Sequence, residues 1–83
     1  MLSLKTIKKY EPEMRRLKVS EVARSRRGFT TAYKRAGGDP NKLSDSWKRK
    51  RLAFIARHGV QYHKKPSTRR RLALIAWAYD PDR

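Results

Sequence analysis

The chain has 83 residues and carries 23 Lys and Arg against 7 Asp and Glu, a formal net charge of +16. This length allows one small domain and excludes two. The absence of Cys excludes disulfides and thiolate chemistry, and the large positive charge predicts an anionic partner that would also offset self-repulsion.

Short helices separated by Gly and Pro are predicted along the chain. Ser3 begins a helix over residues 4–10, which ends before Pro12, and a basic stretch follows at residues 14–18. We therefore predict an N-terminal basic helix or arm over residues 1–18 and a compact helical basic domain over residues 19–83.

The middle of the chain predicts two shorter helical elements. Ser20 is the expected N-cap of the first, and a helical stripe of apolar residues over 29–36 is stopped by Gly37-Gly38. Asp39-Pro40 then predicts a capped turn with Pro at the first helical position.

The C-terminal half predicts two helices that each carry cations first and apolar residues later. Ser44 caps a helix over residues 45–58 that Gly59 ends, and Ser67 caps a helix over residues 68–79 after a basic linker. No segment alternates with the period of a strand. The predicted fold is all-α, a small single domain of about four short helices.

Three clusters of cations point to phosphate contacts. Cations in the first turn of a helix oppose its dipole, which becomes favourable when an anion binds the free N–H groups and the Arg forks. The alternative is a solvated basic turn, but Arg outnumbers Lys by 13 to 10, which favours bidentate phosphate contact. The predicted nucleic-acid-binding residues are Arg24, Arg26, Arg27, Lys48, Arg49, Arg51, Ser67, Thr68, Arg69, Arg70 and Arg71.

Four further residues are predicted to contact bases or grooves. Residues 19–23 and 28–35 are similar to a helix-turn-helix, except that four residues separate the two segments where three are typical. The aromatic candidate for a base or sugar contact is Tyr62 in the basic linker, whereas the other aromatics are expected in the core. The residues that would face a major groove are Thr30, Thr31 and Lys34.

The sequence shows no catalytic or metal-binding pattern. The seven acids lie mostly at caps, turns or the tail, and neither histidine has ligand-type residues spaced around it. Phosphate-loop, dinucleotide and nucleophile motifs are absent. We predict a protein that is not an enzyme and that needs neither a cofactor nor a metal.

Five segments between Val19 and Tyr79 carry a resemblance to other proteins. They read SEVAR (20–24), GF (28–29), AYKRAG (32–37), FIARH (54–58) and LALIAWAY (72–79). In these segments the chain resembles a group of small, basic proteins of bacteriophages and other large DNA viruses. That group has no assigned activity, so the resemblance implies a viral setting and no functional residues.

The chain is expected to act inside the host cell or in a virion, without a membrane partner. Its longest apolar run covers residues 72–79, far short of the roughly 20 residues needed to cross a bilayer, and no secretory leader is visible.

The leading prediction is a non-enzymatic nucleic-acid-binding protein that contacts the phosphate backbone with little sequence specificity, with DNA favoured over RNA. One alternative is a minor structural component of a virion or another large assembly, with acidic or capsid-type protein partners. A second alternative is an RNA-binding or ribosome-associated protein. The sequence does not indicate an oligomeric state.

Overall fold

The computed structural model describes residues 1–82, which form five α-helices and one 3-10 helix. No strand occurs in this range, and the radius of gyration of 11.8 Å is that of a compact domain of this length. The predicted small all-α domain is therefore confirmed, while Arg83 lies outside the described residues. The elements are α1 (Leu4–Leu17), α2 (Glu21–Arg24), α3 (Phe29–Arg35), η1 (Pro40–Lys42), α4 (Asp45–Lys64) and α5 (Thr68–Ala76).

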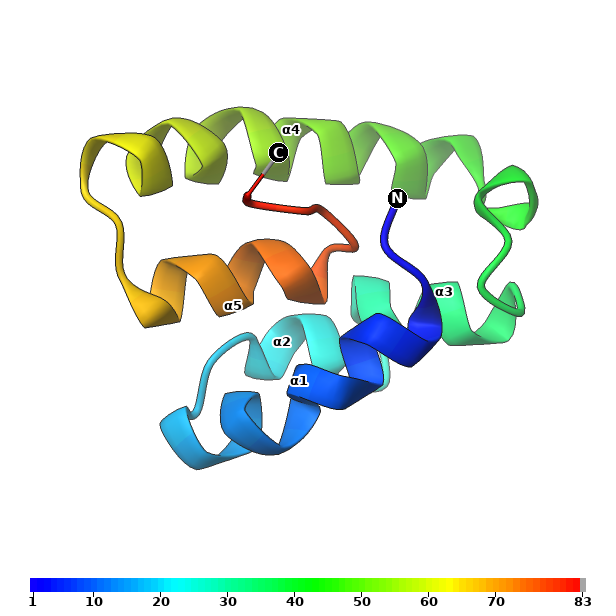
Figure 1. The fold of residues 1–83 in the computed structure, drawn as a ribbon. Helices are drawn as coiled ribbons and strands as arrows, with labels where there is room; N and C mark the ends of the chain where they lie inside the picture. The colour runs from blue at the N-terminus through cyan, green and yellow to red at the C-terminus, as the bar shows by residue number, and fades with distance from the viewer. Residues whose placement is uncertain (83) are drawn as a thin grey trace.

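The central element of the domain is α5. The chain reverses after α4, so that α5 returns beneath it, and α1 crosses on the far side of α5 (Figure 1). α3 packs against both α2 and α4. The middle position of α5 explains why its apolar run is buried, with Leu72, Leu74, Ile75 and Ala76 all at most 2% exposed.

Two groups of buried side chains make up the core, and α1 contributes to both. Met14 packs with Leu72 and Ile75 in the first group, and Ile7 packs with Phe29 in the second. Trp77 lies against both groups and joins them. The N-terminal helix, predicted as a basic arm, thus packs through its apolar side into the same core as the rest of the chain.

Five aromatic rings from α3, α4 and the end of α5 form a continuous column. Tyr33 stacks on Phe29, with ring centres 5.7 Å apart, and Phe29 stacks on Trp77 at 5.0 Å. Trp77 continues to Phe54 at 4.5 Å, and Phe54 to His58 at 4.0 Å. Stacked aromatic pairs add to the stability gained from their buried area.

α1 is longer than predicted, because it continues past Pro12 to Leu17. Proline in a helix interior removes one backbone hydrogen bond and is unfavourable by about 3 kcal/mol. The helix persists because Ile7, Glu11 and Met14 lie on one side and are all buried in the domain. Tertiary packing therefore overrides the local signal.

α4 is also longer than predicted, since Gly59 lies inside the helix and the expected linker is helical to Lys64. Gly59 is buried on the side of α4 that faces the domain, one position after His58 of the aromatic column. Tyr62, about one turn after Gly59, is half-buried on the same side of α4. The helix therefore continues beyond the glycine because it still buries inward-facing residues there.

Several predicted caps are confirmed, and one holds the N-cap position without the side-chain hydrogen bond. The side chains of Asp39, Ser44 and Ser67 each accept a backbone N–H in the first turn of the following helix. Gly37 and Gly38 have φ of 67° and 74° and end α3 as expected. Ser20, by contrast, has φ of 58° and makes no side-chain cap bond.

α5 ends at Ala76, three residues before the predicted limit. Ala78 has a positive φ of 59°, and the N–H groups of Ala78 and Tyr79 donate to Ile75 and Leu74. This is the pattern of a Schellman cap, here without glycine. Leu2 N–H donates to the Ala78 carbonyl at 2.9 Å and fixes the turn against the start of the chain.

Candidate functional site

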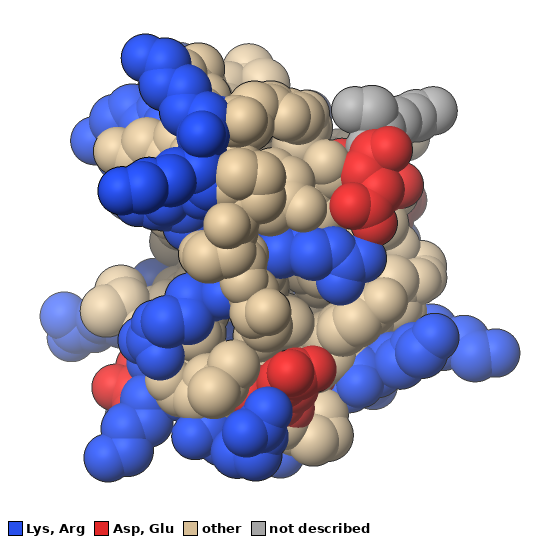
Figure 2. All heavy atoms as spheres, turned by 60° about the vertical axis from the view of Figure 1, so that its left-hand side comes forward, with Lys and Arg blue, Asp and Glu red and all other residues tan. Residues whose placement is uncertain are grey.

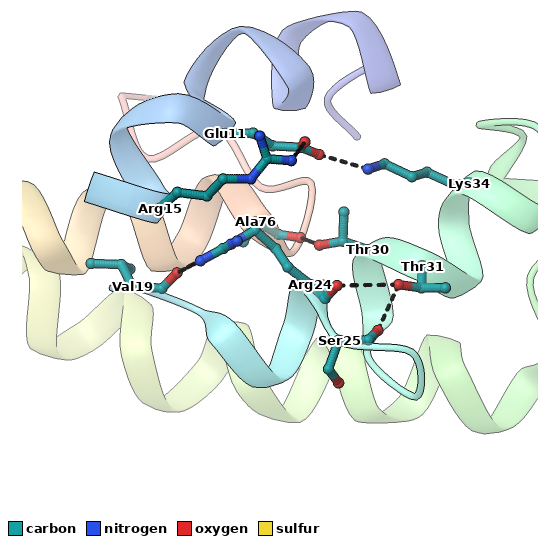
Figure 3. A network of polar contacts seen from close by, with 9 residues as sticks. All are labelled: Glu11, Arg15, Val19, Arg24, Ser25, Thr30, Thr31, Lys34 and Ala76. Carbon is teal, nitrogen blue, oxygen red and sulfur yellow. Dashed lines mark hydrogen bonds and ion pairs between the residues drawn. The ribbon is translucent and has the colours of Figure 1, made fainter. Parts of the chain in front are cut away.

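Four of the predicted phosphate-binding arginines donate to backbone carbonyl groups, and two of them do so through two hydrogen bonds each. Arg24 of α2 donates from Nε and Nη2 to the Val19 carbonyl oxygen, at 3.3 and 2.9 Å (Figure 3). Arg51 of α4 donates to the carbonyl oxygens of Trp77 and Ala78, at 2.8 and 2.9 Å. Burial lowers the pKa of Arg51, because the guanidinium group loses water where α4 meets the end of α5.

Arg69 and Arg70, at the start of α5, each reach the end of another helix. Arg69 Nη1 donates to the carbonyl oxygen of Leu17, the last residue of α1. Arg70 Nη1 donates to that of Lys65, directly after α4, at 2.7 Å. The last carbonyls of a helix have no partner within it, and a guanidinium group supplies a charge-assisted hydrogen bond. Both arginines therefore serve as caps.

The anion site predicted at the start of α5 is not assembled in the structure. Arg71 lies on a side of α5 different from those of Arg69 and Arg70, and it donates a hydrogen bond to Asp82 at 2.7 Å. This hydrogen bond raises the pKa of Arg71 and lowers the pKa of Asp82. Ser67 Oγ accepts the backbone N–H of Arg70 at 3.2 Å, and Thr68 is exposed. The three guanidinium groups point apart instead of converging with these hydroxyls.

Thr30 and Thr31 of α3, predicted to face a major groove, both donate hydrogen bonds to backbone carbonyls of the chain (Figure 3). Thr30 is fully buried and donates to the Ala76 carbonyl at 2.8 Å. Thr31 donates to the carbonyl of Ser25 at 2.6 Å. The predicted helix-turn-helix geometry is wrong here, because Thr30 faces α5 and is closed to any groove.

Lys34 pairs with the buried carboxylate of Glu11 and links α3 to α1 (Figure 3). Glu11 Oε1 lies 2.8 Å from Lys34 Nζ, and Oε2 accepts a hydrogen bond from Arg15 at 3.3 Å. The Glu11 side chain is only 9% exposed. A buried carboxylate is tolerated when cations compensate it, so Lys34 has a structural partner.

Tyr62 lies on α4 and not in a linker. It is half-buried, and its ring centre is 5.7 Å from that of His63. Its predicted role depended on Gly59 ending the helix, and that premise is wrong.

α4 carries a group of exposed cations that make no ion pair within residues 1–82. Lys48 and Arg49, from the predicted set, are exposed and make no ion pair there. The same holds for Arg26 and Arg27, in the connection before α3. The α4 cations that the sequence-based prediction missed are Lys50, Arg57 and Lys64.

Lys50, Arg57 and Lys64 form a row along one side of α4, which we call the basic row. They recur every seven residues, nearly two helical turns, so neighbours in the row lie about 10 Å apart along the axis. Lys50 Nζ lies 4.8 Å from the centre of the Trp47 ring. The seven-residue spacing is visible in the sequence, but the predicted helix end at Gly59 concealed it.

Acidic residues are missing from the part of the chain that contains this row. Residues 46–79 include no Asp or Glu, and the four ion pairs within residues 1–82 use only Glu11, Glu13 and Asp82. Figure 2 shows Lys and Arg side chains over much of the visible surface, densest along one edge, with few acids. The positive charge of α4 is therefore not neutralised within the described structure.

Within residues 1–82, no helix combines the length and the apolar character needed to span a membrane. No protein-family model, curated protein or solved structure matches this chain. A role for the chain is therefore inferred from its own residues.

Proposed function

We propose that this chain is a non-enzymatic nucleic-acid-binding protein that holds the phosphate backbone through the exposed side of α4, with little sequence specificity. The observation that supports this most is the basic row of Lys50, Arg57 and Lys64 on a helix without acids after Asp45. Exposed cations without an acidic partner in the described structure remain available to an external anion. A regular row along a helix of about 30 Å matches a linear polyanion better than a small ligand.

The arginines that hold helix ends are not counted in this proposal. Arg24, Arg51 and Arg69 already donate to backbone carbonyls, and using them for phosphate would leave those carbonyls unpaired. The proposed contacts are instead the exposed cations Lys48, Arg49, Lys50, Arg57 and Lys64, with Arg26 and Arg27 as further candidates.

The test measures the salt dependence of binding to a labelled DNA duplex of roughly 20 base pairs by fluorescence anisotropy. With about 6–10 phosphate contacts, affinity should fall about 10³- to 10⁵-fold between about 50 and 200 mM salt. Replacing all three residues of the basic row by Gln should flatten the logarithmic salt slope by roughly 2.7, since each contact contributes about 0.9.

A matched control removes the same charge from α1. Lys5, Lys8 and Lys9 are exposed, and replacing these three by Gln lowers the net charge equally without touching α4. This control should keep most of the slope. Equal losses in both triple variants would show a diffuse charge effect, and no binding at about 50 mM salt would refute the proposal. The viral setting implied by the sequence resemblance stays a prediction.

A further inference from the structure

The outward side of α4 also carries an exposed apolar strip, which consists of Ala53, Ala56 and Val60, with Leu52 at its edge. Leu52 is 63% exposed and Val60 is 53% exposed, and both alanines are exposed as well. α4 runs along one edge of the molecule, with the other helices on its opposite side (Figure 1). The strip is therefore open to a partner along the middle of the helix.

Cations surround this apolar strip. Helical geometry places the basic row along one of its sides. Lys48 is nine residues from Arg57, about 2.5 turns, and so lies toward the other side. Arg49 and Lys64 stand at the two ends of the strip. A matching partner must thus offer an apolar surface with negative charge on both sides of it.

A second copy of the chain does not meet this requirement. Antiparallel pairing of two α4 helices would bring Arg49 of one copy close to Lys64 of the other, and parallel pairing would align identical cations. No acid between residues 46 and 79 could compensate either arrangement. Close like charges are unfavourable, so the charges select against self-association through this side.

The major groove of B-form DNA does offer an apolar surface with negative charge on both sides. Its width of about 12 Å admits an α-helix, whose diameter is about 10–12 Å with side chains. Phosphates line both edges of the groove, and thymine methyl groups offer apolar contacts on its floor to residues such as Ala. The major groove of A-form RNA is too narrow and deep for side chains to read.

We infer that α4 enters the major groove of duplex DNA, with the apolar strip against base edges and the flanking cations on the phosphates. This inference rests on the proposed function and adds to it the class of nucleic acid and the groove. Alanine and valine cannot hydrogen-bond a base edge, so the preference is a modest one for thymine-containing sites.

The test compares three labelled duplexes of the same sequence at one salt concentration. They are DNA, DNA with deoxyuridine in place of every thymidine, and RNA. We expect DNA to bind at least tenfold more tightly than RNA, and deoxyuridine, which lacks only the methyl group, to weaken binding several-fold. Because the substitution is made in the ligand, the result does not depend on any protein variant being folded.

Two protein variants with the same added charge complete the test. Ala56→Glu places a carboxylate in the apolar strip, whereas Val22→Glu places one on an exposed position of α2, away from α4. Ala56→Glu should weaken DNA binding at least tenfold more than Val22→Glu does. Sedimentation of both variants shows whether the strip joins copies of the chain.

The outcomes separate this inference from the proposed function. Equal affinity for DNA and RNA, with no effect of deoxyuridine, would overturn the inference while salt-dependent binding upheld the proposed function. An oligomer that Ala56→Glu dissociates would assign the strip to protein contact and overturn the inference too. Absence of binding to every duplex would overturn both.

Discussion

Gly28 precedes α3, at a point where the chain passes very close to its own backbone. A Cβ atom there would lie 2.1 Å from the carbonyl oxygens of both Val22 and Ala23. No side chain could move aside to relieve this overlap, because both contacts are with backbone atoms. The close approach of α2 and the start of α3 thus depends on glycine at this one position.

We predict that Gly28→Ala destabilises the domain by about 3 kcal/mol or more, since the backbone of α2 must shift. Gly59→Ala is the control. The nearest atom to its added Cβ is Ile55 Cγ2 at 4.0 Å, an ordinary contact, and alanine favours a helix interior by about 1 kcal/mol. Urea denaturation followed by circular dichroism measures both. If Gly28→Ala were as stable as the original chain, the turn would differ from the one described.

We predict that His58 makes the stability of the domain depend on pH. Burial lowers its pKa below the usual value of 6.5, and the neighbouring charge of Arg57 acts in the same direction. The unfolded chain then binds a proton at a higher pH than the folded chain. The free energy of unfolding should therefore decrease as the pH falls below about 6.5, and level off below the folded pKa.

The matched variant is His58→Phe, which keeps a ring against Phe54 and removes the titrating group. Thermal unfolding between about pH 7 and pH 5 should lose this part of its pH dependence in the variant. An unchanged slope would exclude His58 as its source. The Asp82 carboxylate, whose pKa Arg71 lowers, acts in a more acidic range and does not confuse the comparison.

The roles of single residues could be predicted from sequence where their partners are local. Ser44 and Ser67 cap helices through N–H groups three residues away, and both were predictable from residue type and position. Arg51, in contrast, bonds carbonyls 26 and 27 residues away. A basic cluster in the sequence looks the same whether its guanidinium groups face phosphate or the ends of other helices.

At the scale of elements, an ion pair with a buried carboxylate adds to the apolar contact between Ile7 of α1 and Phe29 of α3. Glu11 and Lys34 are the only members of an ion pair between these two helices in residues 1–82, and the carboxylate is nearly inaccessible to water. The other three ion pairs lie within α1 or join α5 to the C-terminal segment. The pair thus adds a polar contact to the apolar packing between α1 and α3.

We predict a coupling energy of about 1–3 kcal/mol between Glu11 and Lys34 in a double-mutant cycle with Glu11→Gln and Lys34→Met. The comparison pair is Glu13 and Arg16, which are 3.2 Å apart and have side chains 43% and 69% exposed. Its coupling should be only about 0.3–0.5 kcal/mol, because solvent screens it. Equal coupling in both cycles would contradict the structural role of Glu11.

The lengths of the elements were harder to predict than their existence. Pro12 and Gly59 are strong local signals for a helix end, yet both lie inside helices. Each helix continues because its inward side keeps burying residues beyond that point, such as Met14 in α1. That benefit comes from α5 and other distant segments. The basic row was missed for the same reason, since Lys64 falls beyond Gly59.

For the whole molecule, the net charge of +16 works against the compact state. Only four ion pairs relieve it within residues 1–82. The overall fold class was nevertheless predictable, because Gly, Pro and the apolar spacing divide the chain into helical segments. The surface that binds a partner could not be predicted, because it depends on which cations already make hydrogen bonds or ion pairs within the fold.

We predict that a polyanion stabilises the folded chain. A saturating anionic polymer such as heparin, at roughly 100 times its Kd, adds about 2.7 kcal/mol to the free energy of unfolding. For a domain of this size that corresponds to a rise of about 10 °C or more in Tm. Scanning calorimetry with heparin, and with uncharged dextran as the control, measures the shift. An equal rise with dextran would attribute it to crowding.

The aromatic column also determines which part of the fold a fluorescence or circular dichroism measurement of unfolding reports. Trp47 and Trp77, whose ring centres are 6.2 Å apart, are the two tryptophans of the chain, and both lie at this column. Their emission therefore reports whether α3, α4 and α5 are assembled, and indoles this close couple their electronic transitions into a circular dichroism signal of native packing. α1 contains no tryptophan. Its detachment from α5 would be followed better through the methyl resonance of Met14.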